Sequence, residues 1–162
     1  MVAPARFDAP APLNAQVVET LYAEALCLAD EARAAFEPSD MDQRDIATNA
    51  EQIARSIEGL RTTTRVMHML AWLLNQRAYF SGELNKTQLE RHGALPPDRA
   101  PDKDHVALLD GRARAVIEQT ELLYARIVRI EQEQRGEERG GEGPANAMQN
   151  RLAAAFDRAA DA

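Results

Sequence analysis

The sequence predicts an all-α protein: an antiparallel three-helix bundle with one long central helix, followed by a flexible C-terminal tail that carries a short amphipathic helix. Apolar residues make up 45% of the 162 residues but aromatic residues only 5%, so we expect an aliphatic, alanine-rich core, which favours helices. No proline occurs between Ser39 and Leu95, so nothing there forces a helix to end. Apolar residues also recur at alternating spacings of three and four, which is typical of helices that bury one face.

Changes in composition divide the chain into four segments. Residues 1–12 are rich in proline and alanine and are expected to be disordered, and residues 13–134 form the bundle. Residues 135–144, RGEERGGEGP, are predicted to be a flexible linker. Residues 145–162 are predicted to contain the C-terminal amphipathic helix.

The first helix is expected to run from an N-cap at Asn14 to about Phe36. The dipeptide Glu37-Pro38 should end it, because the residue before a proline disfavours the helical conformation. Its predicted buried positions are Val18, Leu21, Ala25, Leu28, Ala32 and Ala35.

The second helix is expected to start at a cap on Ser39 or Asp40 and to reach about Phe80, with Gly82 ending it. Gly59 lies in its middle and predicts a close approach of another helix, since glycine otherwise costs about 1 kcal/mol there. A four-three spacing without a break predicts a coiled-coil-like buried seam along this helix. The seam positions are Ile46, Ala50, Ile53, Ile57, Leu60, Thr64, Met67, Ala71, Leu74 and Ala78.

Further along the chain, Thr87 and Glu90 predict a capping box for one short helix, 88–92, and residues 93–101 form a loop. Asp102 or Asp104 is expected to cap a third long helix that reaches about Gln134. Its predicted apolar positions are Val106, Leu109, Ala113, Val116, Thr120, Leu123, Ile127 and Ile130.

The region 66–74 of the second helix is apolar around its whole circumference, so it must be buried on all sides. The second helix is also longer than the first, which leaves apolar surface uncovered in a monomer. We therefore expect a homodimer. The residues expected at its interface are Val66, Met69, Leu70, Trp72 and Leu73.

Charge and cysteine content restrict the partners. The net charge is −7 and the pI is near 5.0, which argues against binding to nucleic acid or anionic membranes. Four arginines on the long helix, Arg55, Arg61, Arg65 and Arg77, are expected to pair with acidic residues of neighbouring helices. The single cysteine, Cys27, excludes an internal disulfide and is expected to be a small buried hydrophobe.

No signal peptide and no apolar run of about 20 residues is found, so we expect a soluble cytoplasmic protein. Known catalytic and cofactor motifs are also missing, and no Glu-x-x-His pair occurs. We therefore expect no enzyme activity, no catalytic residues, no cofactor and no metal. A phosphotransfer domain using His68 is an alternative, but the apolar residues 69–72 favour a packed or interfacial histidine.

The C-terminal segment presents Met148, Leu152 and Phe156 on one face at helical spacing, and these are the predicted partner-binding residues. A helix this short is marginal in water by itself. It either docks back on the bundle or binds another molecule. On a flexible linker it would act as a tethered docking peptide at high local concentration.

The stretch 61–84 resembles the core of the RcdA family, regulators of CtrA degradation in alphaproteobacteria, and a looser resemblance covers the helices from about Asn14 to Gln134. It consists of scaffold positions rather than catalytic ones. The matching residues are Thr63, Thr64, Arg65, Val66, Met67, Trp72, Leu73, Leu74, Gln76, Arg77, Ala78, Gly82, Glu83 and Leu84.

This resemblance implies a dimeric three-helix bundle with a flexible tail, acting as a non-enzymatic adaptor. Such an adaptor recruits protein substrates or other adaptors to the ClpXP protease, or to its priming factor, in cell-cycle-linked proteolysis. The resemblance implies a cytoplasmic protein that is also found at the cell pole. The alternative is a helical dimeric scaffold or interaction protein unrelated to proteolysis.

Overall fold

The structure is a computed structural model that describes residues 13–37 and 49–140. The described residues contain helices and no strand, so the predicted all-α class with one long helix is confirmed. The chain divides into two compact units at Val128, and each is described by itself. The helices are α1 (Ala15–Phe36), α2 (Asn49–Phe80), α3 (Lys86–His92), α4 (Lys103–Ala107) and α5 (Gly111–Gly140).

Helix α1 matches its prediction at both ends. The side chain of Asn14 accepts a hydrogen bond from the backbone N–H of Val17 at 3.0 Å, which satisfies one of the free donors of the first turn. At the other end, the N–H of Glu37 still donates to Arg33 O, and its own backbone is extended. All six predicted apolar positions of this helix are buried, because a helix with one covered face buries its three-four stripe.

Helix α2 ends where Gly82 adopts a φ of +81°, a left-handed conformation that glycine tolerates best. The N–H groups of Glu83 and Leu84 then fold back onto the carbonyl of Ala78. The expected start of this helix at Ser39 or Asp40 lies outside the described residues.

Gly59 lies in the middle of α2 and faces α1. A Cβ atom at this position would lie 3.1 Å from the ring of Phe36. The predicted close helix approach is therefore confirmed.

The cap of α3 corrects the prediction. Asn85 precedes the helix, and its side chain accepts from the N–H of Gln88 at 2.9 Å while the Gln88 side chain accepts from the N–H of Asn85 at 2.9 Å. This reciprocal pair is a capping box, so the helix starts at Lys86 and both Thr87 and Glu90 lie inside it.

The expected third helix is two helices. Asp102 caps α4 as predicted, through the N–H groups of Asp104 and His105, but α4 ends after five residues. Asp110 then accepts from the N–H of Ala113 at 2.8 Å and opens α5. The chain breaks here because a second capping side chain competes for the backbone donors of a continuous helix.

Helix α5 continues to Gly140, so residues 135–140 of the predicted flexible linker are helical. Charged residues with good helix propensity fill this stretch, and Arg135 pairs with Glu131 one turn earlier at 3.2 Å. The ion pair compensates part of the cost of Gly136, which is about 1 kcal/mol. Residues 141–144 of the linker lie outside the described part.

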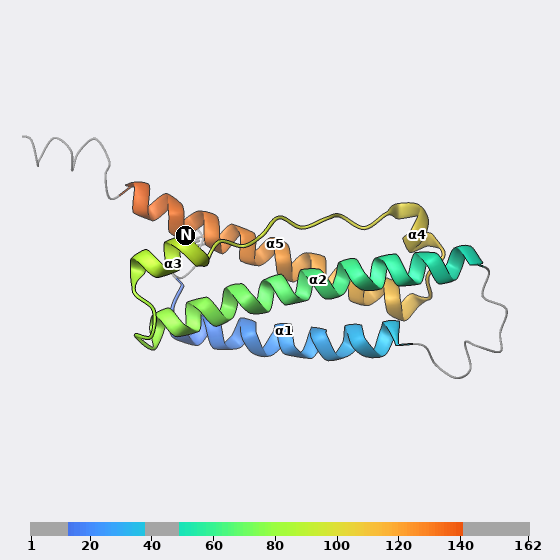
Figure 1. The fold of residues 1–162 in the computed structure, drawn as a ribbon, viewed down its shortest axis with the longest axis horizontal. Coiled ribbons are helices and arrows are strands. Elements are labelled where there is room, and N and C mark those ends of the chain that lie inside the picture. The colour runs from blue at the N-terminus through green and yellow to red at the C-terminus, as the bar shows by residue number, and fades with distance from the viewer. Residues whose placement is uncertain (1–12, 38–48, 141–162) are drawn as a thin grey trace, which may run out of the picture. The chain divides into compact units, whose positions relative to one another are not determined.

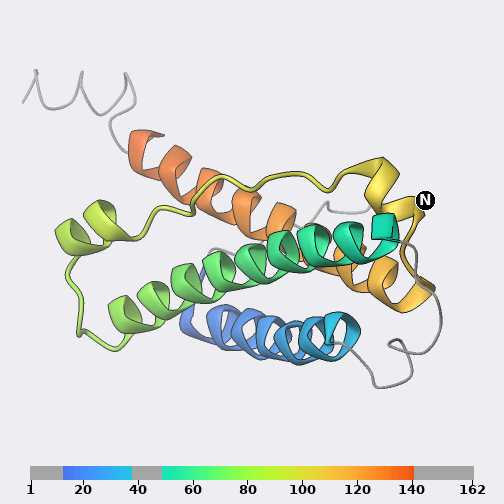
Figure 2. The same cartoon turned by 45° about the vertical axis from the view of Figure 1, so that its right-hand side comes forward.

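In the first unit, α1 runs antiparallel to α2, while the part of α5 up to Val128 runs in the same direction as α2 (Figure 1). The prediction of antiparallel helices therefore holds for the pair α1 and α2. The pair α2 and α5 is parallel instead. A parallel pair needs a connection that returns along its whole length. Residues 93–102 provide it as an extended segment that lies alongside α2 and α5 (Figure 2).

Two aliphatic clusters join the three long helices, and Phe36 packs against both of them. Ala54 of α2 packs with Ala113 and Ile117 of α5, and Ala32 and Ala35 of α1 pack with Val116. Small alanines on all three helices allow the close approach that these clusters require.

Candidate protein-interaction face

The residues predicted for a dimer interface lie mostly inside the single chain. Val66, Met69, Trp72 and Leu73 are all buried in the core, and Leu70 is half-buried. Side chains already packed within one chain are not available to a second copy, so the expected interface is corrected for these four. Their apolar run is explained by burial under the rest of the bundle.

The opposite face of α2 carries the predicted seam, and that face is exposed in the single chain. Leu60 is 70% exposed, Met67 63%, Ile53 49% and Leu74 47%. The prediction that this seam is buried in the bundle is therefore wrong for the described single chain. We call this face the α2 stripe, formed by Ile53, Ile57, Leu60, Thr64, Met67, Ala71, Leu74 and Ala78.

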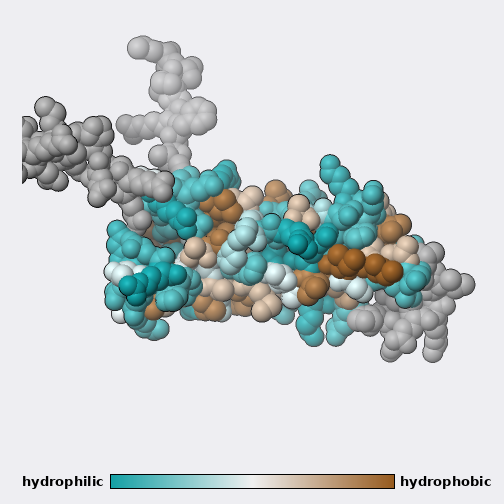
Figure 3. Space-filling model, turned by 45° about the horizontal axis from the view of Figure 1, so that its top comes forward, coloured by the Kyte–Doolittle hydropathy of each residue, from teal (hydrophilic) through white to brown (hydrophobic). Residues whose placement is uncertain are grey.

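The α2 stripe lacks the charges of an ordinary solvent-facing helix surface. The chain is 28% charged, yet every exposed residue from 52 to 74 is uncharged. Figure 3 shows one face of the molecule, on which hydrophobic residues reach the surface among hydrophilic ones. An uncharged surface that exposes several large apolar side chains marks an interaction site. The exposed residues are Gln52, Ile53, Ser56, Leu60, Thr63, Thr64, Met67, Ala71 and Leu74.

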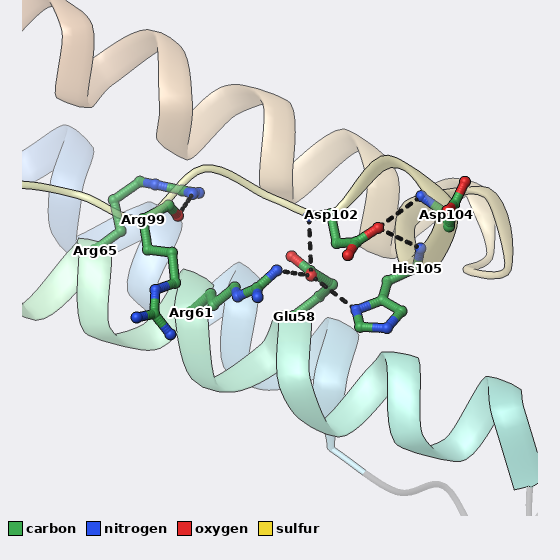
Figure 4. Close-up of polar contacts among 7 residues, drawn as sticks. All are labelled: Glu58, Arg61, Arg65, Arg99, Asp102, Asp104 and His105. Atoms are coloured by element: carbon green, nitrogen blue, oxygen red, sulfur yellow. Dashed lines mark hydrogen bonds and ion pairs between the residues drawn. The ribbon is translucent and has the colours of Figure 1, made fainter.

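A polar network behind the stripe fixes α4 against α2 (Figure 4). Glu58 is fully buried, and its Oε1 accepts from Arg61 Nη1 at 2.6 Å and from the backbone N–H of Asp102 at 3.2 Å. The Nδ1 of His105 lies 3.3 Å from the same oxygen. One buried carboxylate thus holds the start of α4, which sequence spacing did not indicate because Asp102 and His105 lie more than forty residues away from Glu58.

A second buried group, Arg65, holds the extended segment. Its Nε donates to Asp98 Oδ2 at 2.6 Å, its Nη1 to Thr120 Oγ1 at 2.9 Å, and its Nη2 to the carbonyl of Arg99 at 3.4 Å. One guanidinium therefore joins α2, α5 and the crossover. The fork of donors on arginine suits such a junction.

The predicted pairing of these arginines with acidic residues of neighbouring helices is confirmed for Arg77, whereas the acidic partners of Arg55 and Arg65 lie outside the helices. Arg55 pairs with Asp110 at 2.8 Å, and Arg77 with Glu19 at 2.6 Å. Arg65 pairs with Asp98, whereas Arg61 pairs with Glu58 of its own helix. Since each of these cations has a carboxylate partner, they do not form an open anion-binding patch.

His68 borders the α2 stripe and is half-buried. Its Nδ1 is buried and has no hydrogen-bond partner in the described part of the chain. A phosphoryl acceptor needs an accessible nitrogen beside a cation or another donor, so this placement favours the packed or interfacial histidine.

Three further features of the described residues were candidates for a site: a small pocket, possible metal ligands and Cys27. A pocket of about 220 Å³, lined by Arg77, Glu19 and neighbouring apolar residues, is below the size of ordinary ligand sites, about 300–1,000 Å³. In residues 13–37 and 49–140, no cluster of His, Cys, Asp and Glu suits a metal ion. Cys27 is exposed on α1, which corrects the expected burial.

None of the helices in the described ranges combines the length and apolarity that a membrane crossing needs. The predicted partner-binding residues Met148, Leu152 and Phe156 lie outside the described residues.

Fold and surface together define an all-α helical-bundle protein with one exposed, uncharged apolar helix face. The chain belongs to the family described as "Protein of unknown function (DUF1465)", whose family model matches residues 10–156. No curated protein and no solved structure matches the chain.

Proposed function

We propose that the chain is a non-enzymatic adaptor that recruits protein substrates or other adaptors to the ClpXP protease in regulated, cell-cycle-linked proteolysis. The observation that carries the proposal is the α2 stripe, a long uncharged face with large exposed apolar side chains. Such a face binds other proteins rather than small molecules.

The resemblance to the RcdA family supports the choice of pathway. Its matching residues include Val66, Trp72 and Leu73 of the core and Thr64 and Met67 of the exposed stripe. Core positions alone would support only a shared fold. A resemblance that extends to exposed apolar positions also supports a shared way of binding proteins.

The proposed adaptor is a cytoplasmic homodimer, with the cell pole as an additional location implied by the resemblance. Its partners are proteins: ClpX or a priming factor on one side and substrates on the other. The net charge of −7 disfavours nucleic acid as a competing partner. The tail segment with Met148, Leu152 and Phe156 is the proposed docking element for these partners.

A turnover experiment tests this function. Cells with and without the chain are compared by pulse-labelled proteomics, and proteins captured in a proteolytically inactive ClpXP are identified. The adaptor proposal expects a set of proteins that is degraded and captured only when the chain is present. It also expects the chain itself to co-purify with ClpX. Unchanged turnover and no association with ClpX would reject it.

The alternative is a dimeric helical scaffold unrelated to proteolysis. The same stripe supports it, because a binding face does not by itself specify the pathway. Proteins that co-purify with the chain but keep their half-lives when it is removed would favour the scaffold. A chain lacking residues 141–162 locates the contribution of the tail in either case.

A further inference from the structure

The α2 stripe has an internal pattern of side-chain size. One row along it holds the large residues Ile53, Leu60, Met67 and Leu74, spaced by seven. The adjacent row, also spaced by seven, holds Ile57, then the small residues Thr64, Ala71 and Ala78. A spacing of seven keeps both rows on one side of a helix that pairs with another helix.

The two rows complement each other when one copy of α2 is reversed against another. In one antiparallel register, residue numbers of facing positions add to 131. Thr64 then faces Met67 of the second copy, Ala71 faces Leu60, and Ala78 faces Ile53. Each of these three small residues meets a large one, and only Ile57 with Leu74 brings two large residues together, so three of the four kinds of layer meet the condition for dense packing between helices.

A parallel pairing would not pack in this way. It would bring Ala71 against its own copy and Leu60 against its own copy, leaving thin layers beside crowded ones. Gaps at the thin layers cost dispersion contacts, and crowding at the thick layers forces strained rotamers. Antiparallel helices also align their dipoles favourably.

We propose that the α2 stripe is the contact between two copies of this chain, with the α2 helices antiparallel about a two-fold axis at the level of Arg65 and Val66. The contact runs from Ile53 to Ala78, about 38 Å at 1.5 Å per residue. Because the axis relates identical faces, the interface closes as a dimer. The inference rests on the proposed function only for the expectation of a homodimer.

Charge supports a second copy as the occupant. All exposed residues of α2 from 52 to 74 are uncharged, so two copies meet without burying like charges. The arginines beside the stripe, Arg61 and Arg77, are held by Glu58 and Glu19 of their own chain. A cationic or anionic partner would gain no complementary charge here.

Sedimentation of matched variants tests the face. Leu60→Asp and Met67→Asp should convert a dimer to a folded monomer, since both side chains are more than 60% exposed in the single chain. Leu122→Asp is the control, because Leu122 is 65% exposed on α5, off the stripe; it should remain dimeric. A monomeric wild-type chain, or dimers that survive both stripe substitutions, would overturn the proposal.

Cysteine crosslinking in a Cys27→Ser background tests the direction. Leu60→Cys and Ala71→Cys chains should each fail to crosslink alone, because the antiparallel register places each about 16 Å from its own copy. Mixed and allowed to exchange subunits, they should form a disulfide-linked pair. Ala23→Cys, an exposed alanine of α1, is the control and should not crosslink in either mixture.

The outcomes separate this inference from the adaptor function. Crosslinking of each single variant with itself would overturn the antiparallel register and indicate parallel helices. The expected crosslinks with no ClpX-dependent turnover would leave the dimer in place and reject the adaptor. ClpX-dependent turnover by a wild-type chain that is monomeric would support the adaptor and reject the proposed dimer contact.

Discussion

Arg65 and Asp98 form an ion pair of 2.6 Å between the middle of α2 and the extended crossover segment, thirty-three residues further along the chain. The Arg65 side chain is fully buried and that of Asp98 is 15% exposed. A buried guanidinium without its counter-charge is strongly unfavourable. This contact therefore couples the position of the crossover to the stability of the bundle.

Replacing Asp98 with alanine should lower the free energy of unfolding by about 3 kcal/mol, because it leaves Arg65 buried without a carboxylate. Urea unfolding followed by circular dichroism measures the loss. Asp30→Ala is the control, since Asp30 is exposed on α1, and it should change stability by less than about 0.5 kcal/mol. Equal losses in both variants would contradict the role of the ion pair.

Asp110 should contribute stability that disappears in acid. Partial burial raises its pKa, but hydrogen bonds from Arg55 and the N–H of Ala113 outweigh burial and hold the pKa below its ordinary value of 3.8. A carboxyl group with a lowered pKa stabilises the fold above its unfolded pKa, and this contribution is lost as pH falls through the folded pKa.

Asp110→Ala should therefore cost about 1 kcal/mol at pH 7, the usual worth of an N-cap, and less in acid. Asp110→Asn is the control: it keeps a capping oxygen, loses the charge and should cost less than the alanine. Urea unfolding across the acidic range measures the difference. A cost of Asp110→Ala that does not change with pH would show that ionisation plays no part.

Glu121 should destabilise the fold at neutral pH. Burial raises its pKa above the ordinary value of 4.5, and the nearby carboxylates Asp98, Glu118 and Glu58 act in the same direction against Arg65. A raised carboxyl pKa means that stability falls as pH rises through it. Glu121→Gln should thus be more stable than wild type at pH 7 and lose that advantage below pH 4.5. Thermal unfolding at the two pH values decides this, with the solvent-exposed Glu133→Gln as control.

Gly59→Leu should destabilise the bundle by about 1–3 kcal/mol, the usual cost of overpacking. Its Cβ alone would lie 3.1 Å from the Phe36 ring, and a leucine adds three more carbon atoms beyond that Cβ. Gly111→Leu is the control, because no atom lies within 4 Å of its Cβ position. If both leucine variants unfold at the same urea concentration, the close approach of α1 does not limit this position.

The sequence predicted α1 well because that helix has one apolar face. Val18, Leu21 and Leu28 follow a single stripe, polar residues fill the rest, and spacing alone identifies the buried side. The cap at Asn14 and the end at Gly82 were also predictable, since each depends on a few adjacent residues.

Helix α2 shows why the buried face and its polar contacts were not predictable from the sequence. It has two apolar faces, and the sequence favoured the one with unbroken spacing, which is the exposed stripe. The face that the bundle covers includes Glu58 and Arg65, which look like surface residues until their partners are known. Those partners, His105 and Asp98, come from distant segments, and spacing along one helix contains no information about them.

The parallel arrangement of α2 and α5 has a consequence for how the chain folds. Between antiparallel α1 and α2, contacts are graded in sequence separation, from 20 residues for Arg55 with Ala35 to 58 for Arg77 with Glu19. Such a helix pair can form its first contacts beside the connecting segment and then extend them along both helices. The contacts that α2 makes with α5 and its cap all join residues far apart in the sequence. Arg55 with Asp110 and Arg65 with Thr120 are both 55 residues apart. Every one of them closes a large loop at the same entropic cost. We therefore expect α1 and α2 to associate early, and α5 to join them late, in a single cooperative step that sets the folding rate.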